Sequence, residues 1–344
     1  MKNKIKLSEE LRAFISSNDM IGNKVLEIRI KDSYVYSLDQ LSLKYHKDLA
    51  ILLSNNVILN NACCGFVKGK SYLDFLSPHK ESIFFMRLDI SKFFHSIDTA
   101  KIKEFISPLF NKKDFDMDIL ISKLTHEVDP HSENYQFSGA TILPMGFPCS
   151  PVISNLIFRP IDIIISKYCL ENNIIYSRYA DDMLFSSGKK LPIINGDLKS
   201  FVCKLLLKNG LSLNTKKTVC TENHLSLNGY VIDGEHKNIR LSNDKLNKIN
   251  KLTHEILISE RSFKEIGIKI FGYGEDNIRY QSKKMQFFDA FCKDQILNKI
   301  KGYRSYLIGI LKFGYKNNSQ TEKTVQKYNK IIKRLEFIIT KYNK

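Results

Sequence analysis

The 344-residue sequence predicts an α+β fold in which an antiparallel sheet is backed by helices. Strand signals come from Ile83–Leu88 and from both flanks of Tyr179–Asp182, because β-branched and aromatic residues are concentrated there. Helix signals come from amphipathic stretches, among them Leu297–Tyr315 and Glu322–Lys344. We therefore expect a sheet near the middle of the chain and a helical region in its last third.

Two adjacent carboxylates, Asp181 and Asp182, lie between the two apolar flanks within Ile174–Ser187. Carboxylates in such a setting are costly unless a positive group meets them. A divalent metal is one answer, and oxygen ligands favour Mg²⁺ or Mn²⁺. A polar hairpin turn is the other interpretation, since Asp is common in turns.

A third carboxylate favours the metal interpretation. Asp89 ends the apolar strand Ile83–Leu88, which is interrupted only by Arg87. If this strand lies beside the Asp181 hairpin, three carboxylates converge. Such a cluster could hold two metals about 3.5–4 Å apart, as polymerases and nucleases do for in-line phosphoryl transfer. Because Asp89 and Asp181 are 92 positions apart, their convergence is a prediction about the fold.

Five segments together resemble the ordered motifs of reverse transcriptases. They are LDISKFF, LPMGFPCSPVISN, YADD, GLSLNTKKT and LSLNGYVI, which are similar to motifs A, B, C, D and E and begin at Leu88, Leu143, Tyr179, Gly210 and Leu225. The segment CGFVKGKS, Cys64–Ser71, resembles one that bacterial retron-type and other defence-associated enzymes carry before motif A. Retron enzymes continue with Asn-Ala-x-x-His. Here Tyr72–Glu81 departs from that pattern and keeps only His79, which points to a neighbouring group of defence enzymes.

The resemblance implies a right-hand polymerase with fingers at 1–80, a palm at 81–240 and a basic helical, RNA-binding thumb at 241–344. Part of the fingers is expected as an insertion at about 99–142. The implied activity is an RNA-directed DNA polymerase that adds deoxynucleotides to a primer 3′-hydroxyl by two-metal phosphoryl transfer. The implied cofactor is two Mg²⁺ ions, with Mn²⁺ as the alternative. The implied partners are an RNA template, a DNA product, deoxynucleoside triphosphates, a dedicated structured non-coding RNA in antiphage defence, and an effector or second reverse transcriptase subunit.

The resemblance also assigns roles to individual residues of motifs A, B and C. Asp89, Asp181 and Asp182 are the implied catalytic carboxylates and metal ligands, and the Ile90 carbonyl completes the metal site. Phe94 matches the position whose ring excludes a 2′-hydroxyl, so deoxynucleotides should be preferred. The implied nucleotide-binding residues are Ser91, Lys92, Phe93, Phe94, Met145 and Gly146. Either phenylalanine could instead belong to the core.

The later motifs supply the remaining site residues. Met145 stands where the family usually has Gln, while Gly146 is expected where backbone passes close to the nucleotide. Asn155 is a candidate polar contact inside the following helix. Lys217 matches the general acid that protonates pyrophosphate, with Lys216 as the adjacent alternative. The primer-grip hairpin is expected to turn at Leu227, Asn228 and Gly229.

The net charge of +17 indicates a nucleic-acid partner. Residues 241–344 hold 22 Lys and Arg against 10 Asp and Glu, so most of the excess lies in the last third. Lysine enrichment from an AT-rich genome is the alternative, but it does not explain this asymmetry. Candidate nucleic-acid contacts are Lys68, Lys70, Lys301, Arg304, Lys333 and Arg334, with Tyr328 and Tyr342 as stacking candidates.

Other sequence features place the chain in a compartment. Seven scattered cysteines without C-x-x-C pairing favour reduced thiols. No apolar run is long enough to span a membrane and the N-terminus lacks a signal-peptide core, so we expect a cytoplasmic location and no membrane partner. In the fingers region, Lys24, Arg29 and Lys31 are candidates to meet a triphosphate, or they form a solvated strand face.

Three other functions stay open on the sequence. The first is template-independent or protein-primed DNA synthesis by the same palm, which Met145 and the many tyrosines allow. The second is a non-catalytic RNA-binding scaffold, which the full carboxylate set disfavours. The third is a metal nuclease, which the order of the motifs disfavours.

Overall fold

A computed structural model describes residues 4–17, 25–30, 33–111, 113–134, 136–190, 196–274 and 284–342, with side chains from 287 in the last range. Lys24 and Lys31 lie outside these ranges. The chain divides into two compact units. Unit 1 comprises Met1–Pro78 and Phe84–Thr221, and unit 2 comprises His79–Ile83 and Glu222–Lys344. The hairpin similar to motif E therefore groups with the C-terminal helices, whereas the sequence assigns it to the palm.

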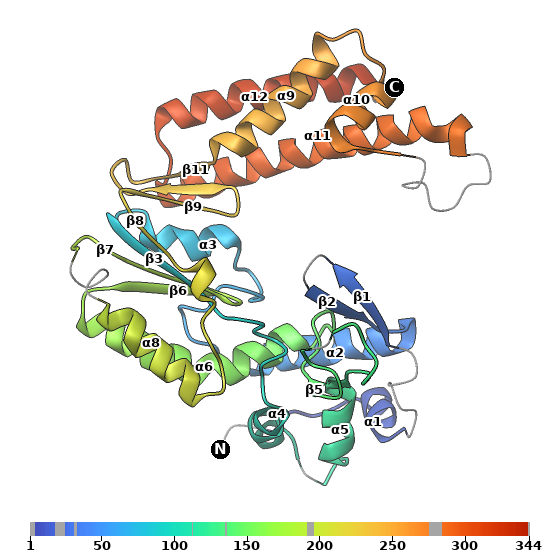
Figure 1. Cartoon of the computed structure of the whole chain (residues 1–344), viewed down its shortest axis with the longest axis vertical. Helices are drawn as coiled ribbons and strands as arrows, with labels where there is room; N and C mark the ends of the chain where they lie inside the picture. The colour runs from blue at the N-terminus through green and yellow to red at the C-terminus, as the bar shows by residue number, and fades with distance from the viewer. Residues whose placement is uncertain are drawn as a thin grey trace. The chain divides into compact units, whose positions relative to one another are not determined.

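A four-stranded sheet with the order β6-β7-β3-β8 forms the centre of unit 1 (Figure 1). Its strands are β3 (Phe84–Asp89), β6 (Ile175–Tyr179), β7 (Asp182–Ser187) and β8 (Val219–Glu222). β7 runs antiparallel to both β3 and β6. Every residue of β7 is buried, and its apolar residues Met183, Leu184 and Phe185 are each 0% exposed.

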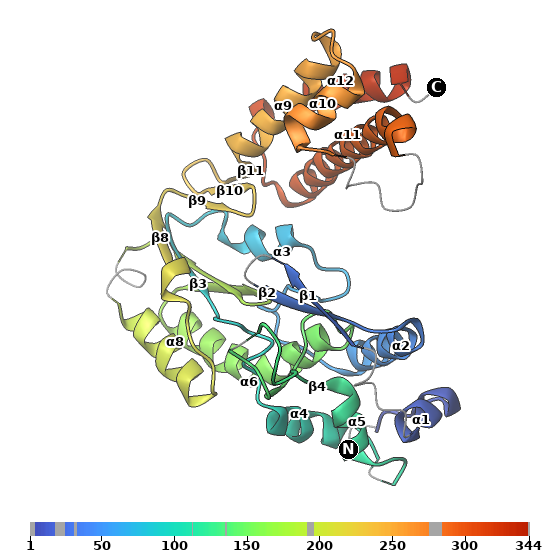
Figure 2. The ribbon, with the colours of Figure 1, turned by 45° about the vertical axis from the view of Figure 1, so that its right-hand side comes forward.

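Helices α6 (Ser150–Glu171) and α8 (Asp197–Lys208) cover one face of this sheet (Figures 1 and 2). Stacking of Tyr168 on Phe201 joins the two helices. Buried residues of β3, β7, α6 and α8 share one hydrophobic core. Ile164 on α6 lies outside this core, since it is 45% exposed.

Short elements complete unit 1. The N-terminal ones are α1 (Glu9–Ser16), a hairpin of β1 (Leu26–Ile30) and β2 (Ser33–Ser37), α2 (Gln40–Asn56), α3 (Tyr72–Leu76) and the 3₁₀ turn η2 (Ser77–His79), whose His79 belongs to unit 2. The insertion after motif A holds α4 (Thr99–Ile106), η3 (Ser107–Leu109), α5 (Met117–Leu124) and a small ladder of β4 (His126–Glu127) and β5 (Thr141–Ile142). The 3₁₀ turn η4 (Thr215–Lys217) precedes β8.

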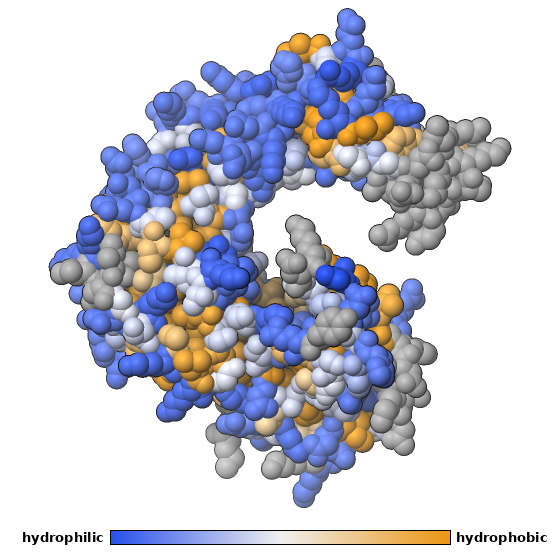
Figure 3. Space-filling model, viewed as in Figure 1, coloured by the Kyte–Doolittle hydropathy of each residue, from blue (hydrophilic) through white to orange (hydrophobic). Residues whose placement is uncertain are grey.

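Over its described residues, unit 2 combines a small antiparallel sheet with four helices. The sheet has the order β11-β10-β9 and consists of β9 (His224–Leu227), β10 (Tyr230–Asp233) and β11 (Asn238–Leu241). The helices are α9 (Asn243–Leu257), α10 (Phe263–Phe271), α11 (Lys284–Asn317) and α12 (Glu322–Tyr342). The visible surface over α9 and α12 is largely hydrophilic (Figure 3). Among the described residues, no helix is both long and apolar enough to cross a membrane.

Candidate active site

The three predicted carboxylates come together at one end of the central sheet. In the β3–β7 register Asp89 lies directly opposite Asp182, and Asp181 belongs to the turn that precedes β7. The Ile90 N–H donates to the Asp181 carbonyl at 3.0 Å, which ties the end of β3 to this turn. Asp89 and Asp182 are buried, and Asp181 is partly exposed. The fold thus brings together side chains that are 92 positions apart in the sequence.

The carboxylates influence one another electrostatically. Burial, reinforced by the neighbouring Asp182 and Asp89, raises the pKa of Asp181 to about 6. Burial likewise raises the pKa of Asp182, although Arg87 opposes this effect. Crowded negative charge of this kind favours the binding of a cation.

Arg87 holds the Asp182 carboxylate. Its Nε and Nη2 atoms both donate to Asp182 Oδ1, at 2.8 and 2.5 Å. Asp182 lies directly opposite Asp89 in the antiparallel ladder, so the two side chains share one face of the sheet. The ion pair engages one oxygen of Asp182, which leaves Asp89 and Asp181 as the carboxylates without an arginine partner among the contacts described here.

Lys217 reaches the site from the 3₁₀ turn η4. Its ammonium donates to Asp89 Oδ2 at 3.0 Å, while its side chain is 54% exposed. Two backbone hydrogen bonds place this segment: Ser91 N–H donates to the Ser212 carbonyl and Asn214 N–H donates to the Asp89 carbonyl. Lys217 thus lies beside the carboxylates as the sequence predicts, and no described contact joins Lys216 to them.

The donor set suits a hard divalent cation. Asp89 and Asp181 offer carboxylate oxygens. The Ile90 carbonyl is a further donor atom, because the β-bridge between Ile90 and Leu213 is made by the N–H groups of Ser91 and Asn214 and does not use that carbonyl. Over the described ranges no three His, Cys, Asp or Glu side chains form a closed metal-binding group. A site of two carboxylates and a carbonyl needs further oxygens, which substrate phosphates supply in polymerases.

The two aromatic residues of motif A have different environments. Phe93 is 3% exposed and packs edge-to-face on Phe158 in the core. The Phe93 ring therefore belongs to the core, which leaves only the backbone of this residue for the predicted nucleotide contact. Phe94 is partly exposed, and its ring centroid lies 6.1 Å from that of Phe66. Of the two rings, Phe94 is thus the one that is open to solvent, and its contact with a sugar stays a prediction.

Ser91 and Lys92 follow Asp89 into a tight turn. Lys92 adopts a left-handed conformation with φ 47°, and its ammonium contacts Gln136 and lies 5.4 Å from the Phe137 ring centroid. The Ser91 N–H is engaged by Ser212. Both residues lie within three positions of Asp89 in the chain, and the Lys92 side chain is exposed.

Motif B packs against the β1–β2 hairpin. The Met145 carbonyl accepts a hydrogen bond from Tyr36 N–H at 2.7 Å. A Cβ atom on Gly146, whose φ is 115°, would lie 2.4 Å from the Tyr36 carbonyl. The structure thus provides a packing reason for this glycine, distinct from the nucleotide contact that the sequence predicts.

Several predicted nucleic-acid contacts have partners inside the protein. Lys70 donates to the carbonyls of Asn61 and Cys63, both at 2.8 Å. Arg29, on β1, pairs with Glu133 at 3.3 Å. Lys68 is exposed. Lys70 therefore supports its own loop, and because its ammonium keeps its charge and is exposed, its contact with phosphate stays a prediction.

In unit 2, the primer-grip prediction falls on a two-residue hairpin. Leu227 pairs with Tyr230, and Asn228 and Gly229 adopt φ angles of 48° and 83°, as a tight Asn-Gly turn requires. Leu227 is only 2% exposed, so its side chain belongs to the core. The turn residues Asn228 and Gly229 are the part of the motif that can contact a ligand.

The remaining candidates for nucleic-acid contact lie on the long helices α11 and α12 of unit 2. Arg304 on α11 pairs with Glu336 on α12 at 2.7 Å, so it joins two helices. Lys301, Lys333 and Arg334 are exposed. Tyr328 is 1% exposed, and its hydroxyl accepts from Leu241 N–H, which rules out the predicted stacking role. Tyr342 packs edge-to-face on Phe263.

Two arginines near the carboxylates were not predicted as site residues. Arg87 and Arg178 each interrupt an apolar strand. A charged residue inside a buried strand must find a partner, so this interruption was the available signal. The sequence did not indicate which carboxylate each arginine would meet.

Comparison with known proteins identifies relatives. A family model described as reverse transcriptase (RNA-dependent DNA polymerase) matches residues 37–270. The retron Ec83 reverse transcriptase of Escherichia coli is 31% identical over 144 residues, which are 42% of this chain and 45% of that protein. The retron Ec86 reverse transcriptase of Escherichia coli is 27% identical over 201 residues, 58% and 57% of the two chains. The chain thus spans about half the length of these relatives.

Among solved structures, telomerase from Candida albicans in complex with a fragment of telomeric RNA has a TM-score of 0.48 at 10% identity, covering 99% of this chain and 64% of that one. Apo telomerase from Candida tropicalis has a TM-score of 0.46 at 11% identity, covering 92% and 65%.

Proposed function

Because the chain belongs to the reverse transcriptase family, we propose that it is an RNA-directed DNA polymerase that extends a primer 3′-hydroxyl with deoxynucleotides. Family membership confirms the predicted α+β, right-hand polymerase fold. In the proposed reaction the primer 3′-oxygen bonds to the α-phosphorus of a deoxynucleoside triphosphate. The bond from that phosphorus to the bridging oxygen breaks, and pyrophosphate leaves.

The observation that carries this proposal is the β3–β7 register. It sets Asp89 opposite Asp182 and places Asp181 in the adjoining turn, with the Asp181 carbonyl held by Ile90 N–H. Asp89, Asp181 and the Ile90 carbonyl would hold two Mg²⁺ ions, and Mn²⁺ is the alternative. When bound, such ions stabilise the charge that develops on the attacking and leaving oxygens.

The protein's own groups account for the other requirements. Lys217, 3.0 Å from Asp89, would donate a proton to the departing pyrophosphate. Arg87 would favour the ionised form of Asp182 through their ion pair. Phe94 would bound the sugar pocket and exclude a 2′-hydroxyl.

A structured non-coding RNA is the proposed partner, with a role in antiphage defence. Support comes from the similarity to retron reverse transcriptases and from the surface of α12. Exposed basic residues recur along one side of this helix at spacings of three, four or seven, namely Lys323, Lys327, Lys330, Arg334 and Lys341. A row of cations along a rigid helix is suited to a nucleic-acid backbone.

The test is incorporation of labelled deoxynucleotides onto a primer annealed to an RNA of known sequence, with the product sequenced. Wild-type protein should yield DNA complementary to the RNA. Asp89→Asn should abolish synthesis. Asp98→Asn is the matched control, because Asp98 only caps α4 through Ala100 N–H and Asn caps a helix equally well.

Each outcome has a definite meaning. Synthesis that persists in Asp89→Asn at the control level would refute the site assignment. Product unrelated to the RNA would replace the proposal with template-independent synthesis by the same palm. RNA binding without any synthesis by the wild-type protein would overturn the catalytic proposal and leave a scaffold.

A further inference from the structure

Among the residues that the structure describes, Arg178 is the largest fully buried side chain, with an exposed fraction of 0%. It lies on β6, two residues before Ala180 and three before Asp181. Burying a guanidinium is strongly unfavourable unless it is paired and hydrogen-bonded. A group of this cost, next to the candidate active site but outside it, calls for an explanation.

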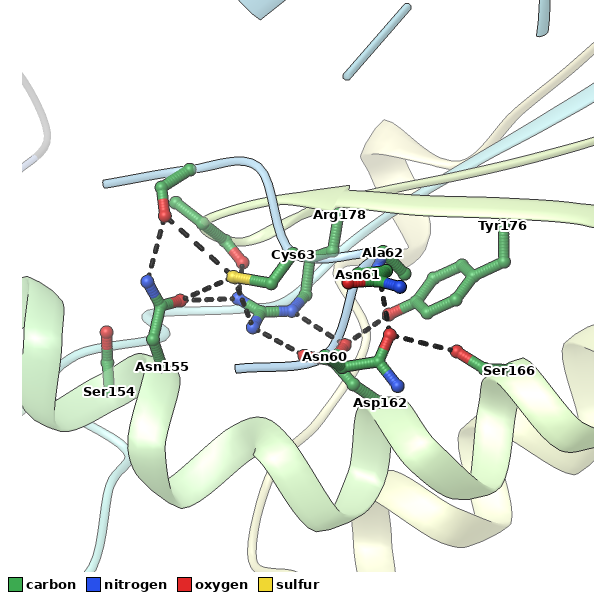
Figure 4. A network of polar contacts seen from close by, with 12 residues as sticks. Asn60, Asn61, Ala62, Cys63, Ser154, Asn155, Asp162, Ser166, Tyr176 and Arg178 are labelled. Atoms are coloured by element: carbon green, nitrogen blue, oxygen red, sulfur yellow. Dashed lines mark hydrogen bonds and ion pairs between the residues drawn. The ribbon is translucent and has the colours of Figure 1, made fainter. Parts of the chain in front are cut away.

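All five N–H donors of Arg178 are used (Figure 4). Nε and Nη2 donate to the two oxygens of Asp162 at 2.9 and 2.7 Å, which forms a bidentate ion pair. Nη2 also donates to Cys63 Sγ at 3.3 Å. Nη1 donates to Asn155 Oδ1 at 3.1 Å and to the Ala180 carbonyl at 2.9 Å. The guanidinium also lies over the Phe158 ring, 4.4 Å from its centroid.

The partners of Arg178 are themselves fixed. Asp162 is buried on α6, and its Oδ1 also accepts from the Tyr176 hydroxyl at 2.7 Å. Asn155, which precedes Asp162 on the same helix, donates through Nδ2 to the Gly65 carbonyl at 2.8 Å. Figure 4 shows these side chains converging from α6, β6 and the segment around Cys63. The guanidinium therefore has one available position.

The contact with Ala180 connects this rigid network to the catalytic turn. Ala180 adopts φ 56°, a left-handed conformation that residues other than glycine rarely adopt. Such a conformation is strained and persists only where its surroundings enforce it. Arg178 holds the carbonyl of Ala180 from one side. Gly65 packs on the other, since a Cβ there would lie 2.4 Å from Ala180 N.

We propose that Arg178 is a positioning residue, whose buried guanidinium fixes the strained Ala180 peptide and thereby the orientation of the Asp181 carboxylate toward a divalent metal. This inference rests on the proposed function. The bidentate pair with Asp162 and the bond to Asn155 anchor the guanidinium, and Nη1 transmits that anchoring to the turn. Arginine suits this role because its planar fork binds several acceptors at fixed angles, which a lysine ammonium cannot reproduce.

The test uses Arg178→Lys in the full-length chain, with two independent measurements. The first is Mn²⁺ affinity, from titration of the free-ion electron paramagnetic resonance signal. The second is kcat and KM for deoxynucleotide incorporation. Lysine keeps the charge beside Asp162 but cannot also hold Ala180, so we expect Mn²⁺ affinity and kcat each to fall about 10- to 100-fold. KM for the nucleotide should change little.

Lys123→Met is the matched control. Lys123 is also a buried cation of unit 1, and its ammonium donates to the Phe14 carbonyl and to Ser17 Oγ. It lies on α5, away from the β6–β7 turn (Figures 1 and 2). This variant should lose thermal stability while its folded fraction keeps wild-type Mn²⁺ affinity. The same pattern in Arg178→Lys would overturn the proposal, because it would show a role in stability alone.

A second variant covers the case in which Arg178→Lys does not fold. Arg178→Gln combined with Asp162→Asn removes both buried charges together, which leaves no unpaired ion. We expect it to fold and to show the same loss of Mn²⁺ affinity. Wild-type Mn²⁺ affinity in this folded double variant would refute the inference. Wild-type protein that binds Mn²⁺ but makes no DNA would instead refute the proposed function.

Discussion

Removal of Arg87 should destabilise the protein by leaving Asp182 buried without its counterion. In the native state Arg87 donates twice to Asp182 Oδ1, and the side chains are 21% and 10% exposed. In the variant Arg87→Met, Asp182 would face Asp89 across the β3–β7 ladder with no cation bound to it. The expected result is lower stability together with a loss of the local order on which the carboxylate site depends.

The magnitude follows from the degree of burial. Removing one partner of a fully buried ion pair costs about 3–5 kcal/mol, whereas exposed pairs contribute about 0–1 kcal/mol. This pair is mostly but not wholly buried, so we expect Arg87→Met to lower the free energy of unfolding by about 2–4 kcal/mol. Arg87→Met combined with Asp182→Leu removes both charges and should lie within about 1 kcal/mol of wild type.

The assay is urea unfolding followed by circular dichroism, in EDTA so that metal binding does not contribute. The double-mutant cycle isolates the interaction between the two side chains. If the double variant were as unstable as Arg87→Met alone, the loss would come from packing of the arginine stem. The explanation by an uncompensated charge would then be refuted.

Three further predictions address the sugar pocket, unit 2 and the basic helix. Phe94→Ala should raise ribonucleotide incorporation relative to deoxynucleotide incorporation by about 10- to 100-fold, measured by single-nucleotide extension; an unchanged ratio would exclude Phe94 as the discriminating ring. Hydrogen bonds from Lys269 and Arg261 lower the pKa of Glu255 to about 2. The stability difference between wild type and Glu255→Gln should therefore be constant above about pH 4.5 and shrink as pH falls towards 2, since the unfolded state then binds the extra proton. Thermal unfolding against pH checks this, and a difference that grows in acid would contradict it. Arg334→Ala should reduce the slope of log affinity for RNA against log salt by about 1, whereas Arg304→Ala, whose charge is paired with Glu336, should leave that slope unchanged; equal effects of the two variants would argue against a specific basic face on α12.

The sequence predicted the central sheet well because its signals are local. β3 and β7 contain apolar runs that end or begin at acidic residues. In the smaller sheet of unit 2, Asn228-Gly229 is likewise a strong local signal, for the hairpin of β9 and β10. Family motifs then supplied the pairing that no local pattern contains. Once β3 and β7 are neighbours, the approach of Asp89 to the Asp181 hairpin follows from register.

Other predictions failed where burial, not residue type, decides the outcome. Phe93 and Phe94 are chemically identical, and only the packing against Phe158 assigns the first to the core. Tyr328 is a residue type that can stack on bases, but its side chain is buried and its hydroxyl accepts from Leu241 N–H inside unit 2. The positions of Arg87 and Arg178 could be seen in the sequence, but their acceptors depend on the three-dimensional fold.

The contact between Gly146 and Tyr36 has a consequence for protein engineering. On β2, the Tyr36 N–H donates to the Met145 carbonyl, and the Tyr36 carbonyl leaves no room for a Cβ at position 146. The hairpin and the motif B loop therefore behave as one interlocking part, although they are distant in the sequence. A chimera that imports the β1–β2 hairpin from a relative should also import Leu143–Phe147, because either segment transplanted alone would meet a backbone to which it is not fitted.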